Sequence, residues 1–557
     1  MKLGPRGPLE SKYNFKMETI KKTLRDSVAL RWLVLVLLSG LTFSTYWFQD
    51  FFGSLKDLMN SEMGISSEEF GRIIGSTTIA NIFGMIIIGG IVLDKWGIRL
   101  AGLVFGGLAA LGAAISAMAT MGFFGDDKGT ILTFLIIGRI MFGSGLEVVC
   151  VVATRTIVKW FKGYEMALAM AINMGFGRLG SALGLAVSLD IAGGSVPPAV
   201  SFAATLIAIA LIMFVIYLTL DVKLDRQQAG ENSKADDDDF KFSDLITLIT
   251  NKSFLYIALL CVSFYAAVFP FIQYAPDLLV NKFGFSYDLP DAGNFVVFGS
   301  STIGTVVIYV CLFIFGLAFS MVPSKMRSHG TKLGSLIVIV ALFAGFAYGL
   351  RDVLSIWLVN GPKTASLIPM GTILFTPIFG NYVDKKGKAA SLMILGALLL
   401  IFAHLALSVF NSVLLGYLGL LSLGVAFSLV PAAMWPSVAK IVAESRLGTA
   451  YASMFTIQNW GLGLFFWGIG ALLDAVNPAI VSKIKEVRSA FEAQGLSNSE
   501  IAENIKAMKL SGEIPPFDYT IPILVLVLCG VVSIFLAFML RKSDKEQGYG
   551  LELPSNH

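Results

Sequence analysis

Charged residues are scarce in this sequence of 557 residues. Asp, Glu, Lys and Arg make up 14% of the chain and hydrophobic residues make up 55%, whereas about a quarter of the residues of soluble proteins are charged. The net charge is only +4, so the sequence lacks the strongly basic character by which many proteins bind nucleic acid, and no nucleic-acid partner is expected. These proportions exclude an ordinary soluble protein and indicate an integral membrane protein in a lipid bilayer.

Histidine and cysteine are also rare, which excludes several kinds of site. The three histidines, at positions 329, 404 and 557, have no metal-ligand spacing, so neither a metal nor a cofactor is expected. The four cysteines lie in apolar runs and are expected to be free thiols. The motifs H-E-x-x-H, G-x-S-x-G and G-x-x-x-x-G-K-[S/T] are absent, so we expect neither an enzyme nor an ATP-driven pump.

Long apolar runs dominate the sequence instead. A helix needs about 20 residues to cross a bilayer, and fourteen runs reach that length, six before a polar linker and eight after it. We therefore expect an all-α membrane protein with about 14 transmembrane helices. The runs are 30–52, 72–93, 100–121, 131–153, 165–190, 199–220, 253–280, 293–321, 334–358, 365–383, 389–410, 413–438, 447–473 and 520–540.

The runs divide the chain into two helical bundles with short polar ends. The expected segments are an N-terminal tail at 1–28, a six-helix bundle at 29–220, a linker at 221–251, the first helix of a second bundle at 252–286, an extra hairpin at 287–362, the rest of the second bundle at 363–541, and a C-terminal tail at 542–557.

Short basic turns indicate the orientation. Lys and Arg gather at 95–99, 155–162, 325–332, 385–388 and 440–446, and every one of these turns falls on the same side as the basic N-terminal tail. Because basic short loops stay in the cytoplasm, we expect both termini to be cytoplasmic, in a plasma or inner membrane. On the other side, a long loop at 474–519 has apolar positions at helical spacing between 479 and 509. It predicts one or two amphipathic helices on the outer face, as a connector or alternatively as a cap or partner surface.

Three charges lie inside apolar helices of the first bundle, namely Arg139, Glu147 and Arg178. A charge near the middle of a bilayer costs about 2.5–3.5 kcal/mol unless it has a partner or a wet cavity. The three charges therefore predict a polar site inside the bundle. Elsewhere in the spans, Pro270, Pro377 and Pro436 are expected to break their helices.

A motif is repeated at the ends of two helices. The first copy has Gly90, Asp94, Gly97 and Arg99, and the second has Gly380, Asp384, Gly387 and Lys388. Both read G-x-x-x-D-x-x-G followed by a base. The Asp can accept from a helix N-terminus and the second Gly permits a tight turn. We expect each copy to act as a gate motif that holds a pair of helices together on the cytoplasmic side.

The paired D-x-x-G loops, the linker between halves and the step from Arg139 to Gly143 resemble the major facilitator superfamily. This resemblance covers nearly the whole chain. It implies two six-helix bundles and alternating access around a central cavity.

Shorter motifs resemble the lysosomal dipeptide transporter branch of that superfamily. They span both halves in the order of the branch: W-F-K-G at 160–163, G-R-L-G-S at 177–181, A-V-F-P-F at 267–271, K-F-G-F-S at 282–286, W-P at 435–436, L-G-T-A-Y at 447–451 and I-Q-N at 457–459. The resemblance implies uniport of dipeptides, with the charged pocket residues of the branch falling on Glu147 and Arg178. Tyr46 and Asp50 match an S-Y-x-x-x-D pattern of the branch more weakly.

The chain departs from this branch in two ways. About 75 residues with two extra apolar runs follow K-F-G-F-S, so we expect an inserted transmembrane hairpin in the second half. The lysosomal sorting signal of the branch is not evident in the N-terminal tail.

A zwitterionic peptide requires a base for its carboxylate and an acid for its ammonium. Arg178 can hold a carboxylate with two parallel hydrogen bonds, and Glu147 can hold the amine. The alternative for both residues is a structural ion pair between Glu147 and Arg178 or Arg139, and Arg139 is expected to be a structural or coupling charge. The remaining candidates for contact with substrate are Tyr46, Asp50, Tyr265, Trp435, Gln458 and Asn459.

We therefore expect a secondary active or facilitative transporter of dipeptides or small peptides, acting as a monomer, with a proton as a possible second solute carried by Glu147 or Asp50. An antiporter of organic anions or phosphate esters is the alternative, but the second half has no basic residue near mid-membrane except Arg351 near a helix end. A non-transporting receptor or scaffold is the alternative of another class.

Overall fold

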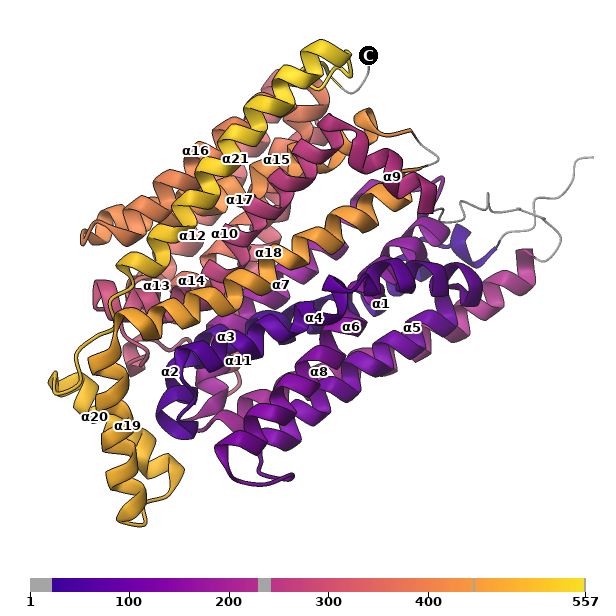
Figure 1. Ribbon diagram of the computed structural model, residues 1–557. Helices are drawn as coiled ribbons and strands as arrows, with labels where there is room; N and C mark the ends of the chain where they lie inside the picture. The colour runs from indigo at the N-terminus through magenta and orange to yellow at the C-terminus, as the bar shows by residue number, and fades with distance from the viewer. Residues whose placement is uncertain (1–22, 229–241, 444–445, 555–557) are drawn as a thin grey trace, which may run out of the picture.

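The computed structural model describes residues 23–228, 242–443 and 446–554, and most of the chain in these ranges is helical (Figure 1). Most of the predicted N-terminal tail, the middle of the predicted linker and the side chain of Asp94 lie outside the described part. The helices of the first half are α1 (Val28–Asp50), α2 (Phe52–Met63), α3 (Ser67–Gly75), α4 (Ile79–Ile82), α5 (Met85–Thr120), α6 (Lys128–Phe161), α7 (Met166–Ala192) and α8 (Val196–Gln228).

The second half is longer. Its helices are α9 (Phe242–Thr250), α10 (Lys252–Phe283), α11 (Ser301–Lys325), α12 (His329–Gly349), α13 (Arg351–Leu358), α14 (Gly361–Ala365), α15 (Leu367–Lys386), α16 (Ala389–Ser408), α17 (Val413–Ile441), α18 (Leu447–Val476), α19 (Pro478–Ala493), α20 (Asn498–Ser511) and α21 (Thr520–Gln547). In the described residues, 13 helices are long and apolar enough to cross a membrane, or up to 14 if a bent pair counts as one span. The predicted all-α membrane protein with about fourteen spans is confirmed.

The bent pair is a break that the sequence analysis did not predict. Ser67–Ile82 and Met85–Leu93 meet at an angle of 54°, and Gly84 between them has a φ of +81°. The predicted breaks at Pro270, Pro377 and Pro436 are wrong, because these prolines lie inside α10, α15 and α17. A proline removes one backbone donor, which neighbouring groups in a membrane bundle can compensate, whereas a left-handed glycine turns the chain out of the helix.

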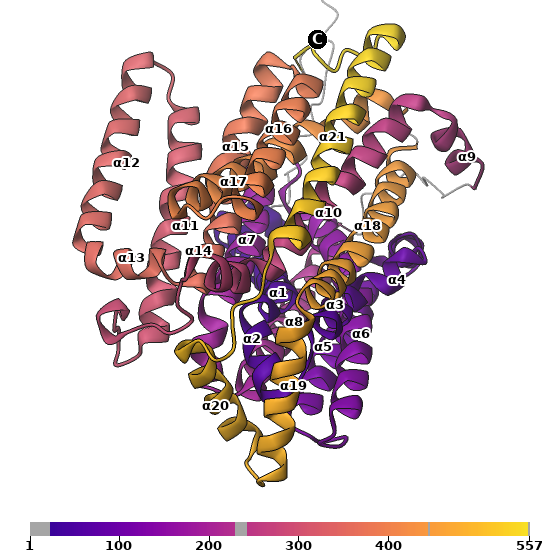
Figure 2. The same cartoon turned by 60° about the vertical axis from the view of Figure 1, so that its left-hand side comes forward.

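The helices pack in a repeated arrangement. In the first half α5 packs against α6 and α8, while α1 packs against α7 and α8. In the second half α16 packs against α17 and α21, while α10 packs against α18 and α21. The two groups lie side by side, with α19 and α20 at one end and the chain terminus and α9 at the other (Figures 1 and 2). These ends are called the cap end and the tail end below.

The inserted hairpin is α11 and α12, joined to the core by α13 and α14. It differs from the predicted runs at 293–321 and 334–358, because residues 293–300 form a loop with a bridge between Val297 and Ser300 and α13 is a separate helix. Helix α11 packs on α7 and α15, so it joins the two halves laterally. Ile339 is the one buried residue of α12 in the described chain, and Figure 2 shows this helix standing apart from the bundle. In a membrane, lipid covers such a helix.

The predicted amphipathic segment forms α19 and α20, whose apolar faces bury Ile484 and Ile505. These helices also bind the first half. The Arg488 guanidinium donates to the carbonyls of Ser61 and Glu62 at 2.9 and 2.8 Å, where α2 ends and its carbonyls lack helical partners. Lys509 forms an ion pair of 2.6 Å with Asp57 of α2. The segment is therefore a cap that holds the two halves together rather than a simple connector.

The two D-x-x-G loops lie at the tail end. Their second glycines have positive φ angles, +74° at Gly97 and +70° at Gly387, which glycine adopts without strain. Arg99 follows the first loop and forms ion pairs with Asp221, at 2.7 Å, and with Asp225 at the end of α8. These contacts anchor the first loop within its own half.

The C-terminal segment 548–553 anchors the second loop in an analogous way. The Glu552 carboxylate accepts from the backbone N–H and the hydroxyl of Ser391, both at 2.8 Å, so it caps the first turn of α16. The backbone N–H of Lys388 donates to the Glu552 carbonyl at 3.1 Å, and Leu551 is fully buried. Acidic residues in the last turns of α8 and in the segment after α21 thus hold the corresponding loops.

Glu552→Ala is expected to lower the free energy of unfolding by about 1 kcal/mol, the usual cost of losing a helix N-cap. The measurement is thermal unfolding of the purified protein in detergent. Glu546→Ala is the matched control, because Glu546 is exposed at the end of α21. Equal melting temperatures for the two variants would contradict a capping role for Glu552.

Candidate functional site

A cavity of about 230 Å³ lies between the two halves of the chain. Its walls come from α1, the bent segment at residues 77–81, α6 and α7 of the first half and from α10, α17 and α18 of the second. All eight residues that the sequence analysis proposed for substrate contact line this one cavity: Tyr46, Asp50, Glu147, Arg178, Tyr265, Trp435, Gln458 and Asn459.

Arg178 lies on α7 and is held by aromatic rings. Its guanidinium carbon is 4.5 Å from the ring centroid of Phe427 and 5.9 Å from that of Tyr46. Such cation–π contacts orient a guanidinium without using its hydrogen-bond donors. Tyr46 and Asp50 are four residues apart on α1, so both face the cavity.

The predicted structural alternative was an ion pair between Glu147 and Arg178 or Arg139. Within the described chain, neither Glu147 nor Arg178 forms an ion pair with another side chain. Glu147 lies next to the amide of Asn459 instead. Both charges are only partly buried and line the cavity, so each is available to a solute.

The second half supplies an aromatic and amide wall. The indole N–H of Trp435 donates to the Tyr265 hydroxyl at 3.1 Å, and the Trp435 ring stacks on Phe455 with centroids 4.8 Å apart. The Gln458 side-chain oxygen accepts from the Cys261 thiol at 3.4 Å. Because these side chains fix one another, the wall is preformed for stacking or for hydrogen bonds to a peptide group.

Arg139 does not line the cavity. It is fully buried and donates to the carbonyls of Phe48 and Gln49 at 2.7 and 3.3 Å. These carbonyls lie at the end of α1, where the helix breaks before α2 and leaves acceptors without helical partners. The geometry favours the structural role that the sequence analysis expected for Arg139.

Three polar contacts that the sequence analysis missed lie at the cap side of the cavity. The Gln273 amide donates to Asp50 at 2.8 Å, and buried Lys56 forms an ion pair of 2.6 Å with buried Asp277. Lys363 forms another with Asp190 at 2.7 Å. All three contacts join the first half to the second. Asp277 inside the predicted run 253–280 was the signal that could have revealed one of them.

Exposure changes along the cavity. Asp50, toward the cap end, is 5% exposed, whereas Met174, one turn from Arg178 toward the tail end, is 62% exposed and lines the same cavity. The cross-half ion pairs and the cap lie on the buried side. In this conformation the cavity is therefore closed at the cap end and reached from the tail end.

Comparison with known proteins places the chain in a family. The family model described as Major Facilitator Superfamily matches residues 35–371. The lysosomal dipeptide transporter MFSD1 of Danio rerio is 25% identical over 462 residues, covering 80% of this chain and 81% of that protein, and the Homo sapiens protein of the same name is 24% identical over 466 residues, covering 80% and 81%. The predicted resemblance to the dipeptide transporter branch is confirmed.

Solved structures share the fold at low sequence identity. A bacterial homolog of the human lysosomal transporter Spinster matches with a TM-score of 0.56 and 13% identity, covering 95% of this chain and all of that one. The nucleoside transporter NupG matches with a TM-score of 0.52 and 14% identity, covering 91% and 99%. Together with the helical architecture and the family match, these likenesses show that the chain belongs to the Major Facilitator Superfamily and is a multi-pass membrane transporter.

Proposed function

We propose that the protein carries dipeptides or similarly small zwitterionic peptides across the membrane by alternating access. The observation that carries this proposal is one base and one acid, Arg178 and Glu147, that line a single cavity without an ion pair to each other. A peptide carboxylate fits the two parallel donors of a guanidinium, and a peptide ammonium fits the carboxylate. The MFSD1 relatives, which are named as dipeptide transporters, support the same substrate class.

The size of the cavity favours a small cargo. Pockets for drug-sized ligands usually have volumes of about 300–1,000 Å³, and this cavity has about 230 Å³. The aromatic wall of Tyr265 and Trp435 can stack on one side chain of the cargo. The amides of Gln458 and Asn459 can bind the peptide group.

An antiporter of organic anions or phosphate esters fits less well. Such cargo carries more negative charge and requires several bases, but among the described residues that line the cavity Arg178 is the only Lys or Arg. The acidic side chains of Asp50 and Glu147 would repel it. A receptor or scaffold would not require a cavity with unpaired charges.

The tail end is proposed to be cytoplasmic, because the short basic turns lie there. The conformation is then open to the cytoplasm and closed on the outer side. Antibody access to epitope tags at either terminus, in intact and in permeabilised cells, tests this orientation. The same cells show whether the protein lies in the plasma membrane, as the sequence analysis expected, or in lysosomes, as the names of the relatives suggest.

The experiment that tests the function is uptake of radiolabelled alanyl-alanine into proteoliposomes that contain the purified protein. Unlabelled alanyl-alanine should compete, whereas N-acetyl-alanyl-alanine, alanyl-alanine amide, xylose and glycerol phosphate should compete poorly. Acceleration of uptake by a pH gradient would indicate symport with a proton on Glu147 or Asp50, and an unchanged rate would indicate uniport. Absence of saturable uptake would refute the proposed function.

A further inference from the structure

The inserted hairpin has an unusual distribution of charge. Residues 301–350, which form α11, the turn after it and α12, contain neither aspartate nor glutamate. Their basic side chains gather at the tail end, where α11 ends and α12 begins, at Lys325, Arg327 and Lys332. These residues and the turn between them are called the hairpin tip below. Three bases without an acid give the tip a charge of +3 when its histidine is neutral.

The fold supplies no acid to neutralise this tip. In the part of the chain that the structure describes, the side chains of Arg327 and Lys332 form neither a hydrogen bond nor an ion pair. Lys325 lies near Glu165, which precedes α7. That carboxylate already pairs with Arg31 of α1 at 3.1 Å. The hairpin tip therefore needs its counter-charge from outside the described chain.

Other basic turns at the tail end are neutralised within the protein. Arg99 and Lys159 both pair with Asp221 of α8, at 2.7 and 2.8 Å. The Lys440 ammonium donates to two backbone carbonyls of the C-terminal segment 548–553, at 3.0 and 2.8 Å. These turns belong to the two bundles, where neighbouring helices bring acceptors close. The hairpin tip has no such neighbour on its outer side.

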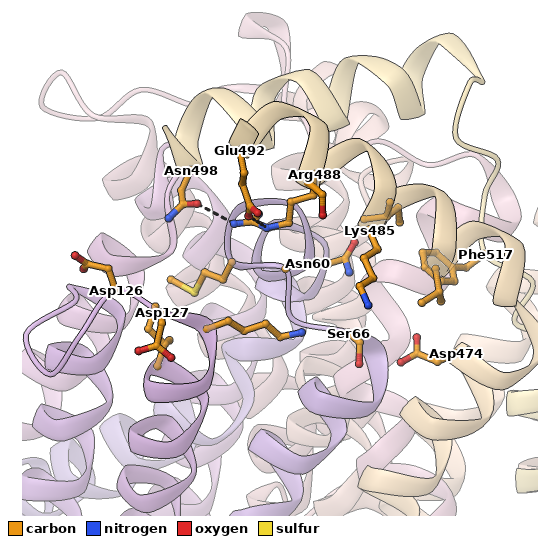
Figure 3. Close-up of a pocket in the computed structure, with 17 residues that line it drawn as sticks. Asn60, Ser66, Asp126, Asp127, Asp474, Lys485, Arg488, Glu492, Asn498 and Phe517 are labelled. Carbon is orange, nitrogen blue, oxygen red and sulfur yellow. Dashed lines mark hydrogen bonds and ion pairs between the residues drawn. The ribbon is translucent and has the colours of Figure 1, made fainter. Parts of the chain in front are cut away.

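The cap end shows the same tendency. A cavity of about 490 Å³ lies there between the cap and the first half, and two of the three described basic side chains that line it are paired (Figure 3). The Arg488 guanidinium donates to the Asn498 side chain at 2.8 Å and pairs with Glu492 at 2.8 Å. Lys128 pairs with Glu69 at 2.7 Å. A group of three bases without any acid is thus a distinct feature of the hairpin.

The surroundings of α12 indicate what supplies the counter-charge. This helix packs on α11, and its remaining surface is open, with Leu333, Ile337 and Leu342 at 57–60% exposed. An apolar helix exposed in this way is covered by acyl chains, so its tail end lies at the level of the lipid headgroups. Anionic headgroups attract basic residues that flank a membrane helix.

The start of α12 adds to this attraction. Ser328 caps the helix, and its first turn is open, because a Cβ added at Gly330 would meet only the Ser328 hydroxyl oxygen, at 4.0 Å. The N-terminus of a helix carries partial positive charge and exposes backbone N–H groups, a combination that favours phosphate. The bases and the helix terminus therefore attract the same kind of group.

A second copy of the chain is the rival occupant of this surface. Gly334, Gly345 and Gly349 lie along one face of α12 with no atom within 4 Å of an added Cβ, and small residues permit close packing of membrane helices. A two-fold axis along the membrane normal would place both hairpin tips at the same depth, with three bases facing three. Like charges repel at such an interface, so the charge favours lipid over a second copy.

We propose that the hairpin tip is a docking surface for anionic phospholipid, whose headgroups bind Lys325, Arg327 and Lys332 while its acyl chains cover α12. The surface is connected to the transport path through α11, which packs on both α7 and α15. The ring of Phe313 on α11 lies 5.2 Å from that of Phe176 on α7, two residues before Arg178. Docked lipid thereby holds α11 where the two halves meet. This inference does not depend on the cargo.

The test is fluorescence quenching in liposomes by phospholipids with brominated acyl chains. A fluorophore is attached through Leu333→Cys, near the start of α12, on a background without native cysteines. At equal content, brominated phosphatidylserine is expected to quench it about twofold or more as strongly as brominated phosphatidylcholine. The triple variant Lys325→Gln, Arg327→Gln, Lys332→Gln should remove this preference. All three positions belong to an open turn, so the variant is expected to fold.

Two controls isolate the hairpin tip. Lys385→Gln with Lys386→Gln removes two exposed bases from the last turn of α15 and should leave the preference at Leu333 unchanged. A label at Leu528, which is 63% exposed on α21, should be quenched equally by the two lipids.

Equal quenching of the Leu333 label by the two lipids would overturn the docking surface, and so would a preference that the triple variant retains. A label that neither lipid reaches, in a protein that cross-links as a dimer, would assign this face to a second copy instead. Uptake of alanyl-alanine is measured separately. Its absence would refute the proposed function and leave the docking surface standing.

Discussion

Arg178→Ala is expected to reduce alanyl-alanine uptake by about 30-fold or more, while the protein stays folded. Removing one partner of a desolvated, hydrogen-bonded charge pair costs about 2–5 kcal/mol, and each 1.4 kcal/mol is a factor of ten in affinity. The side chain contacts the rings of Phe427 and Tyr46 and forms no ion pair in the described chain, so its loss leaves no buried carboxylate without its cation. Initial rates in proteoliposomes and thermal unfolding in detergent measure the two effects separately.

Three further variants define the chemistry. Arg178→Lys should retain part of the activity, because an ammonium keeps the charge but cannot form two parallel hydrogen bonds. Glu147→Gln should weaken uptake of alanyl-alanine while affecting N-acetyl-alanyl-alanine little. Arg72→Ala is the control, since Arg72 is half exposed and its one ion pair in the described part of the chain is with Glu68, one helical turn away. Wild-type uptake by both Arg178→Ala and Glu147→Gln would show that the cargo binds elsewhere.

Lys56→Met is expected to shift the protein toward a conformation that is open at the cap end. Lys56 and Asp277 are 4% and 1% exposed and join α2 to α10. Asp277 also accepts from the hydroxyls of Tyr287, at 2.5 Å, and Tyr519, but these neutral donors do not replace the cation. Removing one partner of a buried ion pair costs about 3–5 kcal/mol. Because the pair exists only while the cap end is closed, its loss destabilises the closed conformation relative to the open one.

The shift is measurable as a distance between the two halves. Spin labels at Met121 and Leu510, which are exposed on the first half and on the cap, should move apart in Lys56→Met on a background without native cysteines. The double variant Lys56→Met with Asp277→Asn should move less, because it leaves no unpaired buried charge. Lys506→Met is the control, since its ion pair with Asp288 is exposed and worth at most about 1 kcal/mol. Identical distances in Lys56→Met and Lys506→Met would contradict a gating role for the buried pair.

Much of the candidate site could be read from single residues. Glu147 and Arg178 stand out because a charge within an apolar helix is costly, and this cost does not depend on which helices are neighbours. The aromatic and amide residues of the second half, such as Trp435, came from motif resemblance, and the structure places them on the same cavity. The positive φ at Gly97 and Gly387 follows equally from the local motif.

Contacts between distant segments could not be read in this way. Lys56 and Asp277 are separated by 221 positions, and the residues around each of them do not indicate which distant residue is its partner. The same holds for Glu552 and Ser391, which are 161 positions apart, and for Lys509 of the cap and Asp57 of α2, which are 452 positions apart. The bend at Gly84 was missed because a glycine in an apolar run more often serves close packing than a turn.

The sequence by itself determined the class of the protein, the number of its spanning helices and the charges that must lie in a polar site. These properties follow from the free-energy cost of placing polar groups in a bilayer. That cost depends on the residues of each segment by itself and not on its neighbours in the fold. Only the tertiary structure decided which charges have no ion pair within the described chain, as Arg178 does, and which are neutralised by a partner, as Lys56 is. The physical reason is that the free energy of a buried charge depends on the partner that the fold brings within hydrogen-bond distance.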